Sequence, residues 1–428
     1  MTKAGPMLFS LSDEIYGPGG SPPSTGNLQY RYSSDGITWA QSELPNQTRT
    51  QGDRERMPGL YDENKWIAYG NGVWTIPASY NTNYSATTLV RTSTDGITWT
   101  EHVDTMPKAY SFNPTNFYTG QYGIYNWYAT IFDGTKFVAM SGDAYYQQPI
   151  VMNSDDGINW TQVSPRFTSA VVNGQTEYYV TADSLYLKTT IEEGGPGNYF
   201  HRFEDMATDN NVIVAAGFWE HTVPYYHDSP WVFLSHDHGV HWTKVEAPIQ
   251  AKWDRVEYGN GVFIMLGRQE LNAQTGASRP VAIRSIDGGL SWVECSLPSN
   301  AVVDYYITSL AYGDGNWVIC RSGQYDDGGK ILVSIDGGQT FDDVVTDPVK
   351  NNYNQEMLSV HCYNVEYFNN RFVAIWGGEA GGSGSQNLLQ VSASVINAEC
   401  SGITIPQLQS IVAASTDFAD FQTRIAAL

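Results

Sequence analysis

One short turn sequence recurs along the chain and constrains its fold more than any other feature. It reads Ser-Ser-Asp-Gly-Ile-Thr-Trp where it first occurs, and a longer form has one extra residue between the aspartate and the aromatic residue. Three short and three long copies occupy 33–39, 93–99, 154–160, 235–242, 285–292 and 334–341. Such repetition predicts a fold built from repeated structural units.

Each copy follows a short β-type run and leads into another, so we interpret the motif as a tight hairpin turn. The aspartate can accept hydrogen bonds from turn amides, and glycine supplies the positive φ that the turn requires. The aromatic residue can anchor the turn against a neighbouring sheet. We therefore assign structural, non-catalytic roles to Asp35, Trp39, Asp95, Trp99, Asp156, Trp160, Asp237, Trp242, Asp287, Trp292, Asp336 and Phe341.

A second repeat alternates with the first and reads Ala-Tyr-Gly-Asn-Gly-Val-Trp-Thr-Ile at 68–76. Further copies begin at 132, 208, 257, 311 and 367. Each copy combines a strand, a Gly/Asn/Asp turn and an apolar second strand. Two hairpins per repeat give four-stranded units of about 50–60 residues, and radial repetition of such units is a β-propeller.

The chain is thus expected to be all-β, with four-stranded antiparallel blades in a propeller spanning 1–405 and a short helical tail at 406–428. The strand positions predict seven blades, and six blades remain the alternative. The first unit lacks a recognisable innermost strand, so we expect a segment near 399–406 to cross back and complete it.

The turn sequences resemble the Asp-box, or BNR, repeats of sialidase-like propellers. The resemblance covers most of the chain and implies the propeller architecture, whereas activity depends on sites carried by the fold. Sialidases of this kind carry an Arg-Ile-Pro motif near the first blade, further arginines, a Tyr–Glu nucleophile pair and an acidic Asp. This chain has no Arg-Ile-Pro, and Arg279-Pro280 lies in the wrong blade. We therefore expect no enzymatic activity and assign no catalytic residue.

Charge and cysteine spacing exclude several classes of partner and cofactor. The formal net charge is −22, which disfavours nucleic acid and anionic membranes. There is no apolar run long enough to insert in a membrane and no recognisable secretory signal. The four cysteines lack metal-type spacing, so we expect buried, reduced thiols. We expect no cofactor and no metal, because the clustered histidines at 221–227 and 236–241 lie on opposite faces of the predicted blade.

One face of the predicted propeller carries short turns, and the other carries long connections at 80–85, 108–122, 143–148, 161–200 and 218–231. The long connections are rich in tyrosine, tryptophan and asparagine, which suits sugar stacking or a protein interface. The alternative is that these aromatic residues pack their own loops. The candidate binding face comprises Tyr80, Tyr84, Tyr145, Tyr146, Trp219, Tyr225, Tyr226 and Trp231.

The last segment has helical spacing after a Ser-Thr-Asp cap, with an apolar stripe of Phe418, Phe421, Ile425 and Leu428. It can dock on the chain's own propeller or on a partner. Its sequence resembles the C-terminal ends of some tailed-bacteriophage structural proteins. This resemblance implies a non-enzymatic virion component, such as a tail, receptor-binding or decoration protein.

For such a component we expect synthesis in the host cytoplasm and residence in the virion, within a homo- or hetero-oligomeric assembly. Other virion proteins or a host-surface ligand, including a glycan, are the expected partners. Two alternatives remain: a glycan-binding or glycoside-hydrolase propeller, and an assembly factor resembling the photosystem II assembly propeller.

Overall fold

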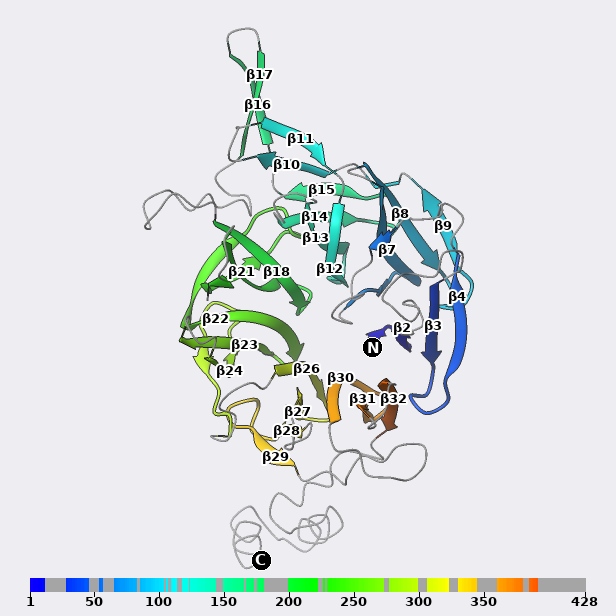
Figure 1. Cartoon of the computed structure of the whole chain (residues 1–428), viewed down its shortest axis with the longest axis vertical. Coiled ribbons are helices and arrows are strands. Elements are labelled where there is room, and N and C mark those ends of the chain that lie inside the picture. The colour runs from blue at the N-terminus through cyan, green and yellow to red at the C-terminus, as the bar shows by residue number, and fades with distance from the viewer. Residues whose placement is uncertain are drawn as a thin grey trace, which may run out of the picture.

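The protein is an all-β structure whose sheets surround a central axis (Figure 1). The computed structural model describes residues 1–11, 28–45, 54–56, 65–82, 85–103, 105–106, 109–113, 118–122, 124–143, 149–164, 167–172, 175–180, 199–221, 226–227, 229–272, 277–298, 306–322, 330–344, 360–379 and 385–391. The predicted boundary at 405 and the predicted tail, with Phe418, Phe421, Ile425 and Leu428, lie outside these residues.

The first sheets are antiparallel and follow the chain order from the axis outward. The first contains β1 (Thr2–Ala4), β2 (Met7–Leu11), β3 (Leu28–Ser33) and β4 (Ala40–Leu44). The second contains β5 (Arg54–Arg56), β6 (Ala68–Gly70), β7 (Val73–Thr82), β8 (Ser85–Ser93) and β9 (Thr100–Val103). The third contains β12 (Ile124–Phe132), β13 (Phe137–Asp143), β14 (Pro149–Ser154) and β15 (Thr161–Ser164).

Two larger sheets complete the ring. One contains β18 (Tyr199–Thr208), β19 (Ile213–His221), β20 (Tyr226–His227), β21 (Ser229–Ser235), β22 (Thr243–Gly259), β23 (Val262–Asn272), β24 (Ala277–Ser285) and β25 (Val293–Glu294). The other contains β26 (Tyr306–Gly313), β27 (Asn316–Ser322), β28 (Lys330–Ser334), β29 (Asp342–Val344), β30 (Val360–Phe368), β31 (Arg371–Glu379) and β32 (Ser385–Val391). The long β22 pairs with β21 through its first half and with β23 through its second half.

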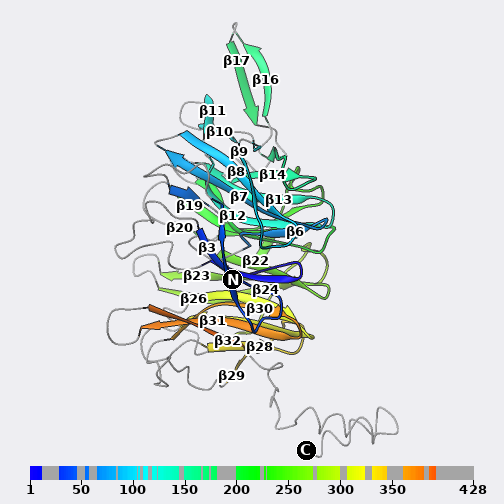
Figure 2. The same cartoon turned by 90° about the vertical axis from the view of Figure 1, so that its right-hand side faces the viewer.

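Two further hairpins stand off the ring. They are β10 (Ala109–Asn113) with β11 (Tyr118–Tyr122), and β16 (Phe167–Val172) with β17 (Gln175–Val180). The β16–β17 hairpin extends beyond the ring in both Figure 1 and Figure 2. Both hairpins arise in connections from the outer strand of one sheet to the inner strand of the next. The prediction that the long connections at 108–122 and 161–200 are loops is therefore wrong where these hairpins form.

The N-terminal unit also differs from its prediction, because β1 supplies an innermost strand paired with β2. The turn between them contains Gly5 with φ +58°, a conformation that glycine adopts without steric cost. The run Thr-Lys-Ala is too short to show alternation in the sequence, which is why it was missed. Within the described residues, the first and last sheets meet where Met1 and Leu8 pack against Phe368 and Val373, and this contact closes the ring.

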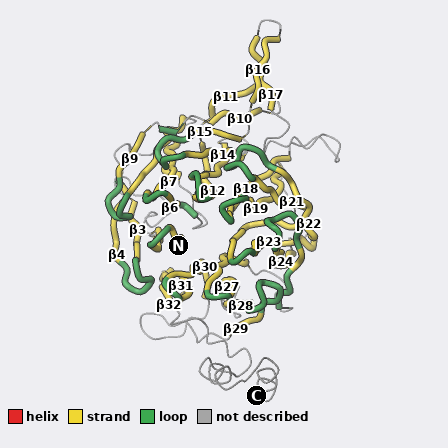
Figure 3. Tube along the Cα trace, turned by 180° about the vertical axis from the view of Figure 1, so that it is seen from behind, coloured by secondary structure: helices red, strands yellow, loops and turns green. Residues whose placement is uncertain are grey.

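The predicted second repeat forms tight hairpins. In the β6–β7 turn, Asn71 and Gly72 both have positive φ, 50° and 79°, as a type I′ turn requires. Figure 3 marks such turns in green around the ring. At the ends of the inner strands, aromatic rings lie over glycines at the end of, or in the turn after, an earlier inner strand: Tyr69 over Gly5, Phe132 over Gly70, Tyr312 over Gly259 and Tyr367 over Gly313. A side chain at these glycines would collide with the rings.

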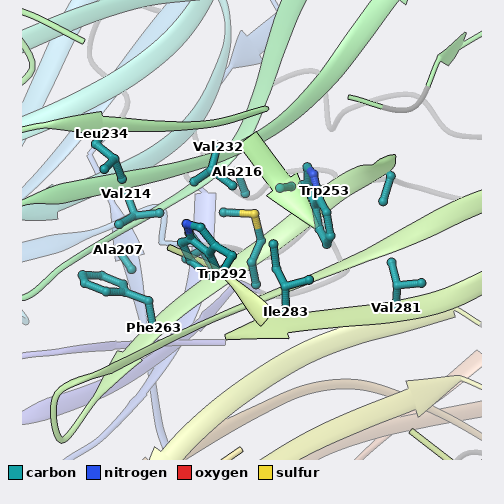
Figure 4. Close-up of a cluster of buried hydrophobic side chains, with 14 of the residues drawn as sticks. Ala207, Val214, Ala216, Val232, Leu234, Trp253, Phe263, Val281, Ile283 and Trp292 are labelled. Atoms are coloured by element: carbon teal, nitrogen blue, oxygen red, sulfur yellow. The ribbon is translucent and has the colours of Figure 1, made fainter. Parts of the chain in front are cut away.

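The hydrophobic core consists of clusters between neighbouring sheets and between the two halves of a long sheet. Figure 4 shows one of the second kind, in which Val214 on β19 and Leu234 on β21 meet Ile283 on β24 and Trp292 in the turn before β25. Trp253, on the long β22, is fully buried in the same cluster. Each sheet therefore buries both faces against its neighbours, which explains the apolar β-strand sequences.

The cysteine prediction is wrong for one pair. Cys320 on β27 and Cys362 on β30 form a disulfide, with Cα atoms 5.5 Å apart. Their strands lie side by side at the Ser322↔His361 pair, and this proximity brings residues 42 positions apart within bridging range. Cys295 is free and buried, and burial raises the pKa of its thiol to about 12. Cys400 lies outside the described residues.

Candidate functional site

The aspartate of each repeated turn binds the turn itself. In the β8–β9 turn, the Asp95 Oδ1 atom accepts hydrogen bonds from the Ile97 amide at 2.8 Å and the Thr98 amide at 2.7 Å. The Ser93 hydroxyl donates to the same oxygen at 2.9 Å and accepts from the Gly96 amide at 2.8 Å. One serine and one aspartate thereby occupy the amides that the tight turn leaves without strand partners.

The other five copies repeat this geometry. The amide directly before the aromatic residue donates to the aspartate Oδ1 at 2.7 to 3.0 Å in all six turns. Hydrogen bonds from the Ile37 and Thr38 amides hold the pKa of Asp35 at about 2, and those from the Thr98 and Ile97 amides do the same for Asp95. These carboxylates stay ionised at neutral pH, which makes them poor general acids.

The aromatic residues of the turns pack into the core. Trp99, Trp160, Trp292 and Phe341 are buried, while Trp39 and Trp242 are partly buried against neighbouring clusters. The indole N–H of Trp99 donates to the Tyr30 hydroxyl at 2.9 Å, which links the second sheet to the first. The turn residues thus stabilise contacts between sheets.

The candidate binding face is only partly covered by the described residues. Tyr84, Tyr145, Tyr146 and Tyr225 lie outside them. Tyr80 lies on β7 opposite Thr87, Trp219 on β19 opposite His227, and Tyr226 on β20 opposite Glu220. The prediction of an irregular loop at 80–85 is wrong, because the β7–β8 ladder continues to Thr82↔Ser85. Likewise, 218–231 is mostly strand, since β19 reaches His221 and β21 begins at Ser229.

Trp231, the last residue of that predicted face, is partly buried against the core cluster between the third and fourth sheets. The Lys244 ammonium lies 4.5 Å from the centroid of its ring, a cation–π distance. Its packing favours the structural alternative for this residue over a free binding surface.

Two of the clustered histidines, His238 and His241, lie against carboxylates. His238 Nδ1 lies 2.6 Å from Asp133 Oδ2 in the turn of the preceding sheet, and His241 pairs with Asp237 within its own turn. Within the described ranges, no group of three or more His, Cys, Asp or Glu residues could hold a metal ion. The part of the chain that the structure describes also contains no helix long and apolar enough to cross a membrane.

A cavity of about 290 Å³ lies on the axis of the ring, where the inner strands converge. It is lined by Thr2, Lys3, Ala4, Gly5, Lys65, Ile67, Ala68, Tyr69, Thr130, Ile131, Phe132, Met206, Ala207, Thr208, Glu257, Tyr258, Ala311, Tyr312, Glu366 and Tyr367. Its aromatic members lie at or beside the short turns that follow the inner strands. The cavity therefore opens toward the short-turn end of the axis, opposite the face favoured by the sequence.

Lys65 spans this cavity. Its ammonium donates to the Met206 carbonyl at 2.6 Å and the Val256 carbonyl at 2.8 Å, and it pairs with Asp205 at 3.2 Å. Asp205 also accepts from the Val256 amide at 3.0 Å. Burial disfavours the charged lysine, but the charges of Asp205 and Glu257 raise its pKa above the usual value. One side chain thus connects the second sheet to strands β18 and β22 across the axis.

Two glutamates line the same cavity, and the Oε1 atom of Glu257 accepts a hydrogen bond from the Tyr258 amide at 3.1 Å. Glu257 Oε2 lies 3.4 Å from the Lys65 ammonium, while Glu366 accepts from the Lys3 backbone amide. Burial and the nearby charge of Glu257 raise the pKa of Glu366 to about 7. Beside them, the Thr130 side chain is 1% exposed, and its Oγ1 has no hydrogen-bond partner within the described chain.

Sequence reasoning missed these residues because they break the second repeat rather than carry it. In five of the inner strands we compared the residue that lies two positions before the last paired residue of the strand. This residue is Thr2, Ala68, Glu257, Ala311 or Glu366. Three of these residues are small and two are glutamates. Aligning the repeats on their turns would have singled out the two glutamates as exceptions.

No protein-family profile matches the chain, and no curated protein matches it. Solved structures do match. YCF48 bound to D1 peptide is 11% identical, covers 86% of this chain and 86% of its own, and has a TM-score of 0.46. Trypanosoma rangeli sialidase in complex with the inhibitor DANA is 15% identical over 95% of this chain, with a TM-score of 0.41.

This chain corresponds to 61% of the length of the Trypanosoma rangeli sialidase. The phage phi92 endosialidase is 10% identical, covers 81% of this chain and 67% of its own, and has a TM-score of 0.40. The chain is similar in structure to sialidase-like β-propellers.

Proposed function

We propose that this protein is a non-enzymatic structural and binding propeller that serves as a virion component of a tailed bacteriophage. In this role it contacts other virion proteins or a host-surface ligand. The ring supplies a rigid scaffold, and segments outside the ring supply the contacts. The virion assignment rests on the sequence of the C-terminal segment.

The observation that carries the binding role is the pair of hairpins, β10–β11 and β16–β17, that stand off the ring. A two-stranded hairpin is marginal on its own in water, and its strand edges can pair with another chain. The two hairpins come from consecutive connections between sheets and lie near each other. They form an arm on one side of the scaffold, as a docking element would.

The non-enzymatic part of the proposal rests on how the repeated carboxylates are used. All six Asp-box aspartates accept hydrogen bonds from their own turns, and the sequence lacks the Arg-Ile-Pro motif of Asp-box sialidases. We infer no turnover of sialosides or common glycans. A purified protein that hydrolyses any of them, with loss of turnover on substitution of one carboxylate, would overturn this inference.

We also propose that the ring has seven blades and that the tail is a separate docking helix. The two long sheets each divide into two groups, β18–β22 with β22–β25 and β26–β29 with β30–β32, because β22 is shared and β27 meets β30 at one pair. Together with the first three sheets this makes seven groups. Deleting 407–428 is expected to leave a folded ring that no longer joins its assembly.

The experiment replaces residues 167–180 with a short Gly-Ser linker. We expect unchanged secondary structure and thermal unfolding, together with loss of incorporation into particles or of the oligomer seen by mass in solution. Asp95→Ala is the matched control, since it weakens the ring without touching the arm. An arm-deleted chain that assembles normally would refute the arm's role, and a glycan array that retains the deleted chain would favour a glycan-binding propeller.

A further inference from the structure

We propose that the disulfide between Cys320 and Cys362 is a redox-sensitive lock on closure of the ring. In the disulfide form the group β30–β32 is fixed to the group β26–β29. In the dithiol form β30–β32 opens more readily at its contact with the first sheet. The inference concerns a different part of the molecule from the arm and stands independently of the proposed function.

The first argument is the position of the seam at which the ring closes. The first sheet begins at the start of the chain, and β30–β32 is the last group of the described residues. The two groups meet through the side chains of Met1, Leu8, Phe368 and Val373. Groups that follow one another along the chain are also joined by the chain itself. Within the described residues, the seam lacks that restraint.

The second argument is that the disulfide lies at the other contact of β30–β32. Cys320 is on β27 and Cys362 is on β30, and the two strands pair with each other at Ser322↔His361. Opening of the seam requires β30–β32 to move relative to β26–β29. A covalent bond between the two groups opposes this movement, because a cross-link removes open conformations from those that the chain can reach.

The third argument is the burial of both sulfur-bearing side chains. Cys320 and Cys362 are each 0% exposed and belong to the apolar cluster between β26–β29 and β30–β32. A reductant therefore reaches the bond only when this contact opens, which couples the redox reaction to movement of the last group. The free Cys295 belongs to a different cluster and provides a buried thiol for comparison.

The chemistry of the lock is thiol–disulfide exchange with a small-molecule disulfide. The Cys320 thiolate attacks one sulfur of the oxidant R–S–S–R, and the first R–S⁻ leaves. The Cys362 thiolate then attacks Cys320 Sγ in the mixed disulfide and releases the second R–S⁻. The two thiol protons pass to the two R–S⁻ groups, so that the protein sulfurs are oxidised and the oxidant is reduced to two R–SH. A reducing compartment favours the dithiol and an oxidising one the disulfide, so closure of the ring responds to its surroundings.

The test is thermal unfolding of the full chain in its two redox states. Oxidised glutathione prepares the disulfide and dithiothreitol the dithiol, and the mass after alkylation verifies each state. The cysteines are 42 positions apart, and a closed loop of that length predicts a Tm about 3–5 °C lower for the dithiol. Reduction should also speed up hydrogen exchange of the β30–β32 amides at least about tenfold, while exchange in β12–β13 changes by less than about twofold.

Variants separate the bond from other effects of the reductant. The double variant Cys320→Ala, Cys362→Ala should have the same Tm with and without dithiothreitol, whereas Cys295→Ala, the matched control, should keep the full response. The proposal is overturned if the two states of the wild type share one Tm, if peptide mapping places the bond between other cysteines, or if reduction speeds up exchange equally in β12–β13 and β30–β32. Because the wild-type chain is compared with itself, a variant that folds poorly leaves the test decisive.

Discussion

Gly313→Ala tests whether aromatic rings packed on glycine backbone hold the inner strands together. Gly313 ends β26 and is not among the residues with positive φ, so alanine suits its backbone. A Cβ atom there would lie 1.9 Å from Tyr367 Cγ, and 2.1 and 2.3 Å from the two Cδ atoms. Because carbon atoms pack at about 3.5 Å, the ring would have to move by roughly 1.5 Å.

The cost follows from what surrounds Tyr367. On one side its ring packs against Phe372, with centroids 4.9 Å apart, while it also lines the axial cavity. The ring can therefore yield toward the cavity, and we expect a destabilisation of about 2–3 kcal/mol, typical of an overpacked site. A transition of 428 residues has an unfolding entropy of about 0.9 kcal/mol per kelvin, so the Tm should fall by about 2–3 °C.

The assay is thermal unfolding, with Gly315→Asn as the matched control. Gly315 has φ +79° and no atom within 4 Å of an added Cβ, and Asn370 occupies the equivalent turn position with φ 60°. The control should therefore lower the Tm by less than Gly313→Ala does, because only the backbone conformation opposes it. Combining Gly313→Ala with Tyr367→Ala should recover at least about 1 kcal/mol relative to additivity. Additive effects, or an unchanged Tm for Gly313→Ala, would refute the packing argument.

Three further predictions concern charged groups. Asp95→Ala should destabilise by about 1–2 kcal/mol through lost turn hydrogen bonds, and an unchanged Tm would contradict the structural role of this aspartate. The pKa of Glu366 is raised from 4.5 to about 7, so ionisation of this side chain opposes folding. The free energy of unfolding should therefore fall by up to about 3 kcal/mol as the pH rises from 4.5 to about 7. A Glu366→Gln variant whose stability depends on pH as that of the wild type does would disprove this. Lys65→Met leaves the buried Asp205 without its cation. The free energy of unfolding, measured in urea, should fall by about 3–5 kcal/mol. A loss below about 1 kcal/mol would show that the ion pair is replaceable.

The hairpins of the ring could be predicted from the sequence because their determinants are local. Asp95, Ser93 and Gly96 make the turn with partners within five residues, and Asn71-Gly72 has the dipeptide of a type I′ turn. The repeat of such signals at regular spacing then favours a propeller. Local chemistry of this kind can be deduced without knowing where the rest of the chain lies.

The β16–β17 hairpin has a local turn signal in the sequence. Between β16 and β17 the sequence reads Val-Val-Asn-Gly-Gln-Thr, and Asn-Gly between β-type runs is the strongest short hairpin signal. This dipeptide lies inside a long connection between repeats, where the repeat pattern alone predicts a loop. Long connections should therefore be searched for hairpins in the same way as the repeats themselves.

The axial cavity could not be predicted by local rules, because its residues are far apart in the sequence. Lys65 and Asp205 are 140 residues apart, and Lys65 and the Val256 carbonyl are 191 apart. Only closure of the ring brings the inner strands together. The disulfide between Cys320 and Cys362 belongs to the same class, since it depends on two strands of neighbouring groups lying side by side.

The two glutamates of the cavity are difficult to explain as scaffold. At the equivalent position the inner strands carry Ala68, Ala311 and Thr2, which shows that the ring can be built with small neutral residues there. Glu366 and Glu257 instead place two carboxyl groups around one cavity, and burial, followed by the charge of Glu257, raises the pKa of Glu366 to about 7. Departures from a repeat that cost stability are expected where a site has another role. Replacing both glutamates with alanine should therefore stabilise the ring, and a double variant that is destabilised would show that the glutamates are needed for the fold itself.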